Sequence, residues 1–261
     1  MQNNNFENYY YAIYNERWPH LRECLLKPSE SVPYSHGLVK PYLLDYASVL
    51  AAKSLRLPES GIILDTCAAP GGKSLVLASL MNSETSLVSN ELSSQRRRIL
   101  ITNLDDHLDN EKRNRVFVTS HDAAKMGSRK NELMRYSAIL LDAPCSSERH
   151  VIQSEKALSQ WTAARPRFLS QRQWSLLSAA FLLLKEGGSL IYSTCAINPE
   201  ENDNVVRRLF EKYGNNVLLD APDFDEGEKT LYGKIILPDV CSGMGPMYVA
   251  RVKKITAENR D

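Results

Sequence analysis

Short apolar runs alternate with helical patterns from Gly61 onward, and this alternation limits the possible folds more than any other feature of the sequence. There are five such runs: Gly61–Asp65, Ser86–Glu91, Arg115–Asp122, Ser137–Asp142 and Ser189–Cys195. Helical periodicity lies between them, most clearly at Ser93–His107 and Gln171–Lys185. Buried strands that alternate with helices are typical of a parallel, doubly wound sheet. We therefore predict an α/β fold.

Two further strand candidates, Asn216–Asp220 and Met247–Val252, lie near the end of the chain. They raise the prediction to a doubly wound, mostly parallel sheet of seven strands. The acidic segment Asp220–Glu228 lies between them. We interpret it as a solvated loop, because charged runs usually face water.

A helix start is predicted directly after the fifth strand. Asn198 stands at the position of an N-cap, Pro199 follows as the first helical residue, and Glu201 stands where a capping box places its acidic partner. This structural interpretation accounts for all three residues, so we assign them no catalytic role. The helix would place its N-terminus near Cys195, which would help to lower the pKa of that thiol.

The first 60 residues differ from the rest of the chain. They are rich in Tyr and Asn, and they are interrupted by Pro28, Pro33, Pro41 and Pro58. Apolar residues recur at helical spacing over Tyr42–Leu50. We predict a small helical annex over residues 1–60, with one long loop near Pro28–Lys40, and a main domain over residues 61–261.

Composition excludes few classes of function. The chain has 261 residues, with 32 Lys and Arg against 31 Asp and Glu, and its net charge of +1 argues neither for nor against a nucleic-acid partner. The five cysteines are odd in number, and no pair has zinc-ligand spacing. We find no secretion signal and no apolar stretch near the roughly 20 residues of a membrane span. We expect reduced thiols, no bound metal, no membrane association and a cytoplasmic location.

Acidic residues end four of the predicted strands, namely Asp65, Glu91, Asp122 and Asp142. An acid at such a position often caps the following helix, which would explain any single one of them. Ligands of open α/β sheets bind beyond the carboxyl ends of the strands, where Glu91 would grip ribose hydroxyls and Asp122 would meet an adenine amino group. Four acids in succession therefore favour a nucleotide-like ligand along the strand ends.

The loop after the first strand, Asp65–Ser74, allows close approach of a ligand. It has small residues and two glycines, and a helix N-terminus follows it. The loop matches neither the phosphate-binding GxxxxGKS/T motif nor the GxGxxG dinucleotide motif. A plain tight turn is the alternative interpretation.

Two thiols and a carboxylate are predicted to meet at one edge of the sheet. Cys145 follows the fourth strand closely behind Asp142, and Cys195 ends the fifth strand. A free cysteine is usually a small core residue, which is how we interpret Cys24 and Cys241. Two cysteines at neighbouring strand ends beside a nucleotide-like site favour covalent catalysis instead.

These motifs resemble the Sun/Fmu family of RNA cytosine-5 methyltransferases, which use S-adenosylmethionine. The resemblance is carried by DTCAAPGGKS, the acidic Glu91, LLDAPCSS and YSTCAINPEEN, and it spans Tyr42 to the C-terminus. A hexamer such as AAPGGK is expected by chance in about one of 10⁵ chains of this length. The segments CSSERH and GPMYVARVKK look most like the short branch that contains a mitochondrial ribosomal-RNA enzyme. The fold implied is the Rossmann-like sheet of class I methyltransferases.

The resemblance implies covalent catalysis. Carbon 5 of cytosine is a poor nucleophile, and addition of the Cys195 thiolate to carbon 6 would turn the ring into an enamine that attacks the methyl group. A free thiol with a pKa of about 8.5 is mostly protonated at neutral pH, so the site must lower that pKa. Asp142 would hold the base at N3, and Cys145 would assist product release. Lys73 would contact Asp142 or the cofactor carboxylate.

The resemblance also implies an S-adenosylmethionine site. The methionine part would be surrounded by the loop residues Cys67, Ala68, Ala69, Pro70, Gly71, Gly72 and Lys73, with Asp142 beside them. Glu91 and Arg96 would contact the ribose, and Asp122 with Ala123 would contact the adenine. Arg96 is alternatively an ordinary surface residue of its helix, as we expect for Arg97 and Arg98.

Basic and aromatic residues follow Cys145. The basic ones are Arg149, His150, Lys156, Arg165, Arg167 and Arg172, against the acid Glu155, and Trp161 and Phe168 lie among them. Such a set can clamp RNA phosphates and stack on bases. We predict RNA contacts for Arg149, His150, Arg165 and Arg167, and a solvated helical face with core aromatics is the alternative. The target cytosine must be unstacked to reach the thiols, which favours a single-stranded or loop site.

The RNA substrate is less defined than the reaction. Many members of the family carry an extra RNA-binding module, whereas about 60 residues precede the first predicted strand here. Substrate choice would then depend on the annex, on RNA shape or on an accessory RNA-binding protein. Ribosomal RNA is the expected substrate, and transfer RNA is the alternative.

Three other functions fit part of the pattern. A DNA cytosine-5 methyltransferase would use Cys145 as its nucleophile, and the presence of Cys195 argues against it. A ribosome-assembly or RNA-binding factor with vestigial catalysis would not need intact Cys145, Cys195, Asp142 and Lys73. A small-molecule methyltransferase would not need a second thiol.

Overall fold

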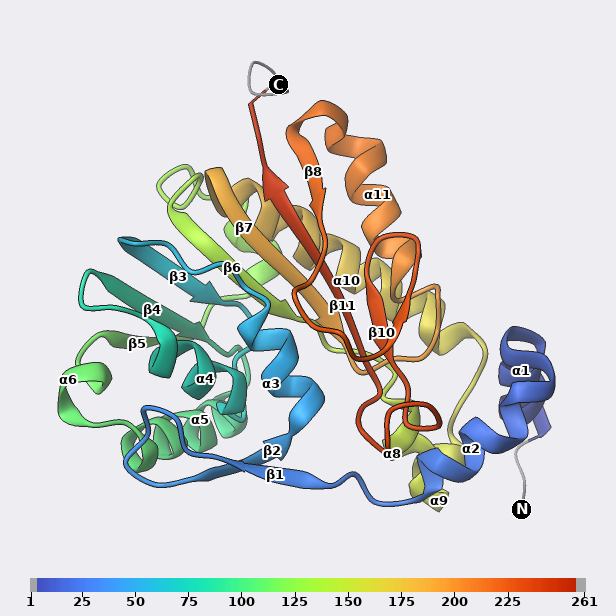
Figure 1. Cartoon of the computed structure of the whole chain (residues 1–261). Helices are drawn as coiled ribbons and strands as arrows, with labels where there is room; N and C mark the ends of the chain where they lie inside the picture. The colour runs from blue at the N-terminus through green and yellow to red at the C-terminus, as the bar shows by residue number, and fades with distance from the viewer. Residues whose placement is uncertain (1–3, 257–261) are drawn as a thin grey trace.

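The apolar runs predicted from the sequence form strands of a sheet that runs through the centre of the protein (Figure 1). The computed structural model describes residues 4–256. The central sheet comprises β3 (Gly61–Asp65), β4 (Thr85–Asn90), β5 (Val116–Thr119), β6 (Tyr136–Asp142), β7 (Leu184–Thr194), β8 (Val217–Asp220), β9 (Glu228–Lys229), β10 (Lys234–Ile236) and β11 (Met247–Lys254). Over the described residues this sheet has nine strands, so the prediction of seven was wrong.

The strand order is β5-β4-β3-β6-β7-β11-β10-β9, with β8 paired to β11. The strands from β5 to β7 are parallel, and β11 runs antiparallel to β7. The mostly parallel α/β sheet is therefore confirmed. Its strand number is higher because β8 and β10 pair with different parts of β11 and β9 adds to β10. β9 and β10 are two and three residues long, which is too short for a periodic signal in the sequence.

Helices cover both faces of the sheet, because successive strand residues point to opposite sides. In β6, Ile139 and Leu141 belong to one hydrophobic core, and Ala138 and Leu140 belong to the other. The first core is covered by α10 (Ala164–Leu183) and α11 (Asp203–Tyr213), and the second by α3 (Tyr46–Lys53), α4 (Gly72–Leu80) and α5 (Ser94–His107). The polar ends of the central strands emerge between these layers.

The remaining helices are short. They are α1 (Asn4–Tyr14), α2 (Trp18–Leu26), α6 (Asn110–Arg113), α7 (Ala123–Met126), α8 (Glu148–Gln153) and α9 (Glu155–Ser159), with 3₁₀ turns at Asn15–Arg17 and Gly214–Asn216.

The helix predicted over Ser93–His107 is confirmed, with Ser93 as its N-cap. The helix predicted over Gln171–Lys185 begins earlier, at Ala164, and ends at Leu183, so that Lys185 belongs to β7. Pro166 lies in the first turn of α10, where a missing N–H is tolerated, and therefore does not mark a boundary.

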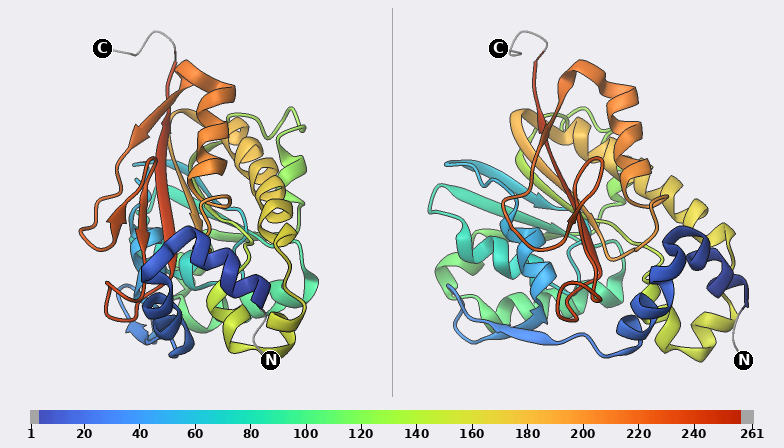
Figure 2. Two further views of the ribbon diagram at one scale, coloured as in Figure 1. Left: turned by 90° about the vertical axis from the view of Figure 1, so that its right-hand side faces the viewer. Right: turned by 45° about the vertical axis from the view of Figure 1, so that its right-hand side comes forward.

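The N-terminal part is less helical than predicted. A hairpin of β1 (Ser31–Tyr34) and β2 (Tyr42–Asp45) occupies part of the predicted loop and the start of the predicted helix. Asp45 accepts a hydrogen bond from Ala47 N, and α3 accordingly begins at Tyr46. α1 and α2 lie beside α8 and α9 (Figure 2) and share a hydrophobic core with the main sheet. The domain division at residue 60 stays a prediction.

The acidic segment Asp220–Glu228 is in part an anchoring site, so its interpretation as a solvated loop was wrong there. Arg251 of β11 is only 1% exposed. Its guanidinium lies 2.8 Å from carboxylate oxygens of both Asp220 and Asp223. The two carboxylates offset the cost of burying the arginine charge. This pairing joins residues about 30 positions apart in the chain, a distance at which local charge patterns carry no information.

Candidate active site

The loop between β3 and α4 lies at the carboxyl end of the sheet, as predicted. Gly71 precedes α4 with φ +119°, a left-handed conformation that side chains disfavour. Ala68 N donates to Asn90 O at 2.9 Å, and Arg96 Nη2 donates to Ala69 O at 2.6 Å. The loop is therefore fixed against the end of β4 and the first turn of α5.

Asp65, the last residue of β3, is a buried acid below this loop. It is 1% exposed, and burial raises its pKa to about 7, although Ser74 Oγ donates a hydrogen bond to Oδ2 at 2.7 Å. Its other carboxylate oxygen, Oδ1, has no hydrogen-bond partner among the described residues. A buried acceptor without a partner is costly. Asp65 is therefore suited to bind a cationic donor.

A cavity of about 340 Å³ lies between the loop and the ends of β4 and β5. Its lining includes the predicted Cys67, Glu91, Arg96 and Ala123. Glu91 accepts a hydrogen bond from Ser93 N through Oε1, and its Oε2 lies 3.3 Å from Arg96 Nη1 without a hydrogen bond. The cavity thus presents one carboxylate oxygen and one guanidinium side by side.

Asp122 lies at the edge of this cavity but outside its lining. It caps α7 through Ala124 N and lies 2.5 Å from Arg172 Nη2. Partial burial alone would raise the pKa of Asp122, but the hydrogen bond and the charge of Arg172 lower it. Arg172, one of the basic residues that follow Cys145, lines this cavity.

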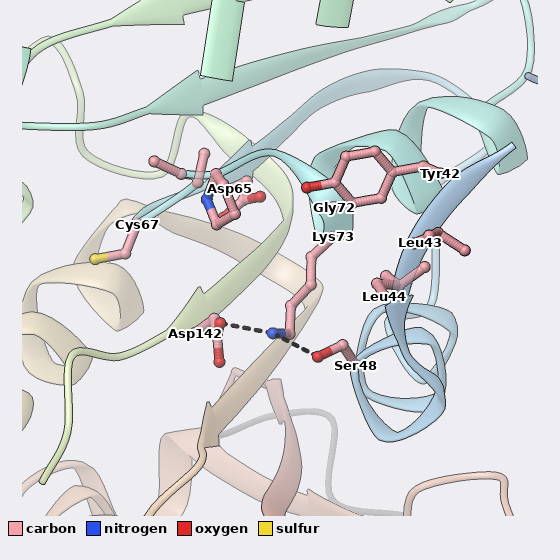
Figure 3. A pocket seen from close by; sticks show the side chains of 12 residues that line it. Tyr42, Leu43, Leu44, Ser48, Asp65, Cys67, Gly72, Lys73 and Asp142 are labelled. Carbon is pink, nitrogen blue, oxygen red and sulfur yellow. Dashed lines mark hydrogen bonds and ion pairs between the residues drawn. The ribbon is translucent and has the colours of Figure 1, made fainter. Parts of the chain in front are cut away.

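A second cavity, of about 240 Å³, lies between the loop and the β2–α3 segment (Figure 3). Lys73 projects into it, with its Nζ 2.7 Å from Asp142 Oδ2 and 3.2 Å from Ser48 Oγ. Burial alone would lower the pKa of Lys73, but the ion pair with Asp142 raises it. The structure shows the contact between Lys73 and Asp142 that the family resemblance implied.

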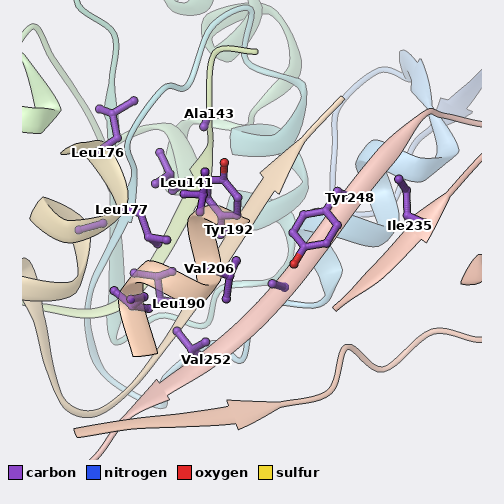
Figure 4. Packing of buried hydrophobic residues seen from close by; sticks show 14 of the residues in the cluster. Leu141, Ala143, Leu176, Leu177, Leu190, Tyr192, Val206, Ile235, Tyr248 and Val252 are labelled. Atoms are coloured by element: carbon purple, nitrogen blue, oxygen red, sulfur yellow. The ribbon is translucent and has the colours of Figure 1, made fainter. Parts of the chain in front are cut away.

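The two thiols meet, because β6 and β7 are adjacent parallel strands in which Asp142 is paired with Ser193. Cys145 Sγ lies 3.0 Å from Cys195 Sγ, and Ser147 Oγ lies 3.3 Å from Cys195 Sγ. Leu141 and Tyr192, near the ends of these strands, pack in the core beside α10 (Figure 4). This buried packing gives the thiol loops a rigid base.

The pKa values of the two thiols are shifted in opposite directions. Hydrogen bonds from Cys145 and Ser147 lower the pKa of Cys195 against the effect of burial. The bond to Cys195 and burial raise the pKa of Cys145. Burial raises the pKa of the nearby Cys67 to about 12. Cys195 is therefore the thiol of this site that ionises most readily, as a nucleophile must.

The helix predicted to begin at Pro199 begins instead at Asp203. Asn198 Oδ1 accepts a hydrogen bond from Glu200 N, but residues 199–202 form turns. Glu201 forms no capping box. Its buried carboxyl group accepts hydrogen bonds from Ser146 N and Gln173 Nε2. The N-terminus of α11 therefore does not act on Cys195, and the lowered pKa of that thiol has another origin, its hydrogen bonds.

The predicted RNA-binding residues divide into two groups. Arg149 and His150 line a cavity of about 360 Å³ next to Cys195. Arg149 Nη2 donates to Gly243 O at 2.9 Å, whereas its Nε and Nη1 have no hydrogen-bond partner among the described residues. Arg165 and Arg167 are exposed on α10 and do not line this cavity.

The two aromatic residues of the predicted RNA-binding region also differ. Trp161 is buried against Phe6 and Tyr9, with ring centroids 5.1 and 5.3 Å apart. The expectation that it stacks on RNA bases was therefore wrong, because a helix from the distant N-terminus covers it. Phe168 is 71% exposed.

Three further residues belong to the site, and the sequence motifs do not include them as candidates. Asn90 lines the 340 Å³ cavity and accepts hydrogen bonds from His121 N and Thr119 Oγ1. Its position directly before Glu91 at a strand end was an available signal. Ser48 and Ser147 contact the lysine and the thiols, and no local pattern distinguishes either serine. The part of the chain that the structure describes shows no group of side chains able to hold a metal ion and no helix able to span a membrane.

Comparison with known sequences agrees with this geometry. A family described as 16S rRNA methyltransferase RsmB/F matches residues 52–253. Ribosomal RNA small subunit methyltransferase F of Aeromonas salmonicida is 36% identical over 88% of this chain and 50% of that protein. The 5-cytosine rRNA methyltransferase NSUN4 of Bos taurus is 32% identical over 85% of this chain and 62% of that protein. The chain thus spans between half and two thirds of the length of these curated relatives.

Solved structures agree on the fold. A methyltransferase homolog protein from Pyrococcus horikoshii has a TM-score of 0.74 at 22% identity, over 94% of this chain and 93% of that chain. NSun6 from Pyrococcus horikoshii, determined with SFG, has a TM-score of 0.69 at 24% identity, over 85% of this chain and 54% of that chain. At this identity the likeness establishes the Rossmann-like fold of class I methyltransferases and no more.

Proposed function

The chain belongs to the 16S rRNA methyltransferase RsmB/F family, and from this premise we propose that it methylates carbon 5 of a cytosine in ribosomal RNA, with S-adenosylmethionine as methyl donor. The observation that carries the proposal is the contact of two thiols, 3.0 Å apart, beside the Lys73–Asp142 ion pair. Methyl transfer to an atom that is already nucleophilic needs no thiol, whereas carbon 5 of cytosine needs one to activate it. The names of the curated relatives support rRNA as the substrate and cytosine-5 as the position.

We assign S-adenosylmethionine to the cavities on either side of the Cys67–Lys73 loop. Two buried carboxylate oxygens there, Asp65 Oδ1 and Glu91 Oε2, lack hydrogen-bond partners among the described residues. Asp65 would bind the ammonium group and Glu91 the ribose hydroxyls, while Ala123 borders the adenine. The cofactor supplies an electrophilic methyl group when bound.

In the proposed mechanism Cys195 Sγ would bond to carbon 6 of the cytosine. Carbon 5, made nucleophilic by this addition, would bond to the methyl carbon of the donor as the sulfur–methyl bond breaks and a neutral thioether leaves. The proton that the Cys195 thiol releases would reach N3 through Asp142. Lys73, paired with Asp142, would offset the negative charge that develops on the ring. Carbon 5 then loses its proton to a base, and the Sγ–carbon 6 bond breaks to restore the aromatic ring. Cys145, in contact with Cys195, assists this release.

The RNA would enter from the cavity that Arg149 and His150 line beside Cys195. The half-buried guanidinium of Arg149, which lines this cavity, would bind a phosphate next to the extruded base. Arg165, Arg167 and the exposed Phe168 extend the proposed contact surface along α10. Transfer RNA is the alternative substrate. An accessory RNA-binding protein stays a predicted partner, and a cytoplasmic location also stays a prediction.

Trapping of the covalent intermediate tests the proposal. Cys145→Ala protein is incubated with S-adenosylmethionine and total cellular RNA, and the products are separated under denaturing conditions. We expect a stable protein–RNA adduct, because the intermediate forms but its release is slowed. The Cys145→Ala/Cys195→Ala double variant is the control and should give none. Sequencing of the trapped RNA identifies the substrate and the cytosine.

Two outcomes would contradict the proposal. An adduct that survives in Cys195→Ala would identify Cys145 as the nucleophile, as in DNA cytosine-5 methyltransferases. Absence of any adduct, with cofactor binding intact, would indicate an assembly or RNA-binding role instead.

A further inference from the structure

A buried polar cluster lies directly behind the two thiols, and the mechanism above does not use it. It consists of Ser146, Glu148 and Glu201, each 0% exposed. We propose that these residues form a clamp that holds a single proton and positions the loops of both thiols for attack and release. The inference rests on the proposed function, because it concerns the same two thiols.

The clamp connects the two catalytic loops. Ser146 directly follows Cys145, and its backbone N donates to Glu201 Oε2 at 2.9 Å. Ile197 lies two residues after Cys195, and its backbone N donates to Glu148 Oε2 at 3.1 Å. Each loop is therefore held by a carboxyl group from the other loop. The hydroxyl of Ser146 lies between the two carboxyl groups and contacts Glu148 Oε1 and Glu201 Oε1.

The number of available protons decides the charge of the clamp. The Ser146 hydroxyl carries one proton and can donate to only one of its two carboxyl neighbours. Glu148 accepts hydrogen bonds on both oxygens, from Tyr10 Oη at 2.5 Å and from Ile197 N. The bonds to Glu201 from Ser146 N and Gln173 Nε2 both reach Oε2, which leaves Oε1 to carry a proton. The contact between Ser146 Oγ and Glu201 Oε1 then requires a proton on Glu201. Glu148 is thus the anion and Glu201 the neutral acid.

The surroundings favour this assignment. Burial raises the pKa of both carboxyl groups, and the charge of Glu148 raises that of Glu201 further, to about 7. No described Lys or Arg side chain makes a hydrogen bond or ion pair with either carboxyl group, so one shared proton is the available compensation for two buried acids. The ionisable groups that interact with the clamp acids are Tyr9, Tyr10 and Tyr14 of α1, Tyr192 of β7 and the two thiols. The carboxyl groups of Glu200 and Asp142 act in turn on Tyr9 and on Tyr192 and Cys195.

Helix α1 braces the clamp. Tyr10 donates to Glu148, Tyr14 Oη donates to Ile197 O at 2.6 Å, and Asn198 Nδ2 donates to Tyr9 Oη at 2.8 Å. These tyrosines belong to the Tyr-rich N-terminal segment, for which the proposed reaction has no other use. The N-terminal helix therefore acts on the chemistry through the loops that carry the thiols.

The protonation of the clamp predicts an asymmetry between its two acids. Glu201→Gln replaces a neutral acid by a neutral amide that can donate to Ser146 Oγ and accept from Ser146 N. Glu148→Gln replaces an anion whose two oxygens both accept hydrogen bonds, from Tyr10 Oη and Ile197 N. The amide nitrogen that it introduces is a donor and would face one of these two donors. We expect Glu148→Gln to lower kcat by about a hundredfold, the loss typical of a 1 Å misplacement of reacting groups, and Glu201→Gln to lower it much less. KM for S-adenosylmethionine should not change in either variant.

A pH profile separates this positioning role from a merely structural one. Above pH 7 the wild-type clamp loses its proton, and a second buried anion near the thiols raises the pKa of Cys195. Glu201→Gln cannot undergo this change and should show a lower Cys195 pKa at alkaline pH. The rate of Cys195 alkylation by iodoacetamide, followed by peptide mass spectrometry from pH 6 to 9, measures the difference. This assay needs neither RNA nor cofactor, so it tests the proposed clamp even if the wild type methylates no RNA.

Two tyrosine variants keep the test valid if Glu148→Gln does not fold, as judged by thermal unfolding. Tyr10→Phe removes one donor to Glu148 and should lower kcat without changing KM for S-adenosylmethionine. Tyr11→Phe is the matched control, because Tyr11 is exposed and bonds only to Glu16, and it should behave as the wild type. Equal activity of the two glutamine variants, with Cys195 alkylation profiles that match the wild type, would overturn the proposal. Equal kcat values for Tyr10→Phe and Tyr11→Phe would do the same.

Discussion

At the scale of single residues, burial changes what Asp65 can bind. Its pKa is raised to about 7 by burial, although Ser74 donates a hydrogen bond that opposes the shift. Such a carboxyl group is ionised in the upper part of the physiological pH range and protonated in the lower part. Only the ionised form can pair with the ammonium group of S-adenosylmethionine.

Cofactor affinity should therefore depend on pH. We expect it to fall by up to about tenfold for each pH unit below 7, because Asp65 becomes protonated. Asp65→Asn should bind weakly and without this dependence, since an amide does not titrate. Calorimetric titration between pH 5.5 and 7.5 measures both. Asp122→Asn is the matched control: Arg172 holds the pKa of Asp122 low, so this variant should change affinity equally at every pH. Constant wild-type affinity over this range would exclude Asp65 as the ammonium partner.

At the scale of elements, the segment from α9 to α10 presents one aromatic residue to the core and another to solvent. Trp161 is 3% exposed and contacts α1, whereas Phe168 is 71% exposed on α10. Both lie in the basic region that follows Cys145, and both are aromatic residues of the kind that stacks on RNA bases. The N-terminal helix decides between them, because it covers Trp161.

Substitution of the two aromatic residues should therefore change different properties: stability for Trp161 and RNA binding for Phe168. Trp161→Ala should lower the free energy of unfolding by about 3–5 kcal/mol, since it leaves a cavity in the core. Phe168→Ala should leave stability unchanged and weaken RNA binding by about 1–3 kcal/mol through a lost stacking contact. Urea unfolding and RNA titration measure the two quantities. Comparable stability of both variants would contradict the packing described, and unchanged RNA binding by Phe168→Ala would remove α10 from the RNA surface.

At the scale of the whole molecule, Arg251 connects parts of the chain that are distant in sequence. It lies on β11, donates to Ser54 O at the end of α3, and pairs with Asp220, the last residue of β8, and with Asp223 in the loop that follows. It therefore fixes the antiparallel edge of the sheet to the helices that cover it. Arg56 reaches the same acids from a position that is 60% exposed.

Arg251→Ala should destabilise the fold by about 2 kcal/mol. This is less than the roughly 3–5 kcal/mol of fully buried pairs, because water solvates part of both carboxylates. Arg56→Ala is the control and should cost about 1 kcal/mol or less, as exposed ion pairs do. The midpoint and slope of urea unfolding measure the free energy. If the two variants lost the same stability, Arg251 would not be the anchor that its burial indicates.

The parallel sheet is predictable from local sequence patterns, because each central strand is an apolar run that ends in a polar residue. Asp65, Glu91 and Asp142 lie at the strand ends where this pattern placed them. Adjacent parallel strands share one carboxyl edge, so the meeting of the two thiols also followed from local information. The shortest strands did not, since runs of two or three residues have no measurable period.

Which side chains act together across the chain depends on the three-dimensional arrangement of distant segments. Glu201 has the local signature of a helix cap, yet it lies buried against Ser146. Trp161 and Arg251 are likewise buried by partners from other elements. Burial and pairing depend on residues that lie about 30 to 155 positions apart in these cases. Local periodicity reports the direction in which a side chain points, and it contains no information about which distant residue will meet it.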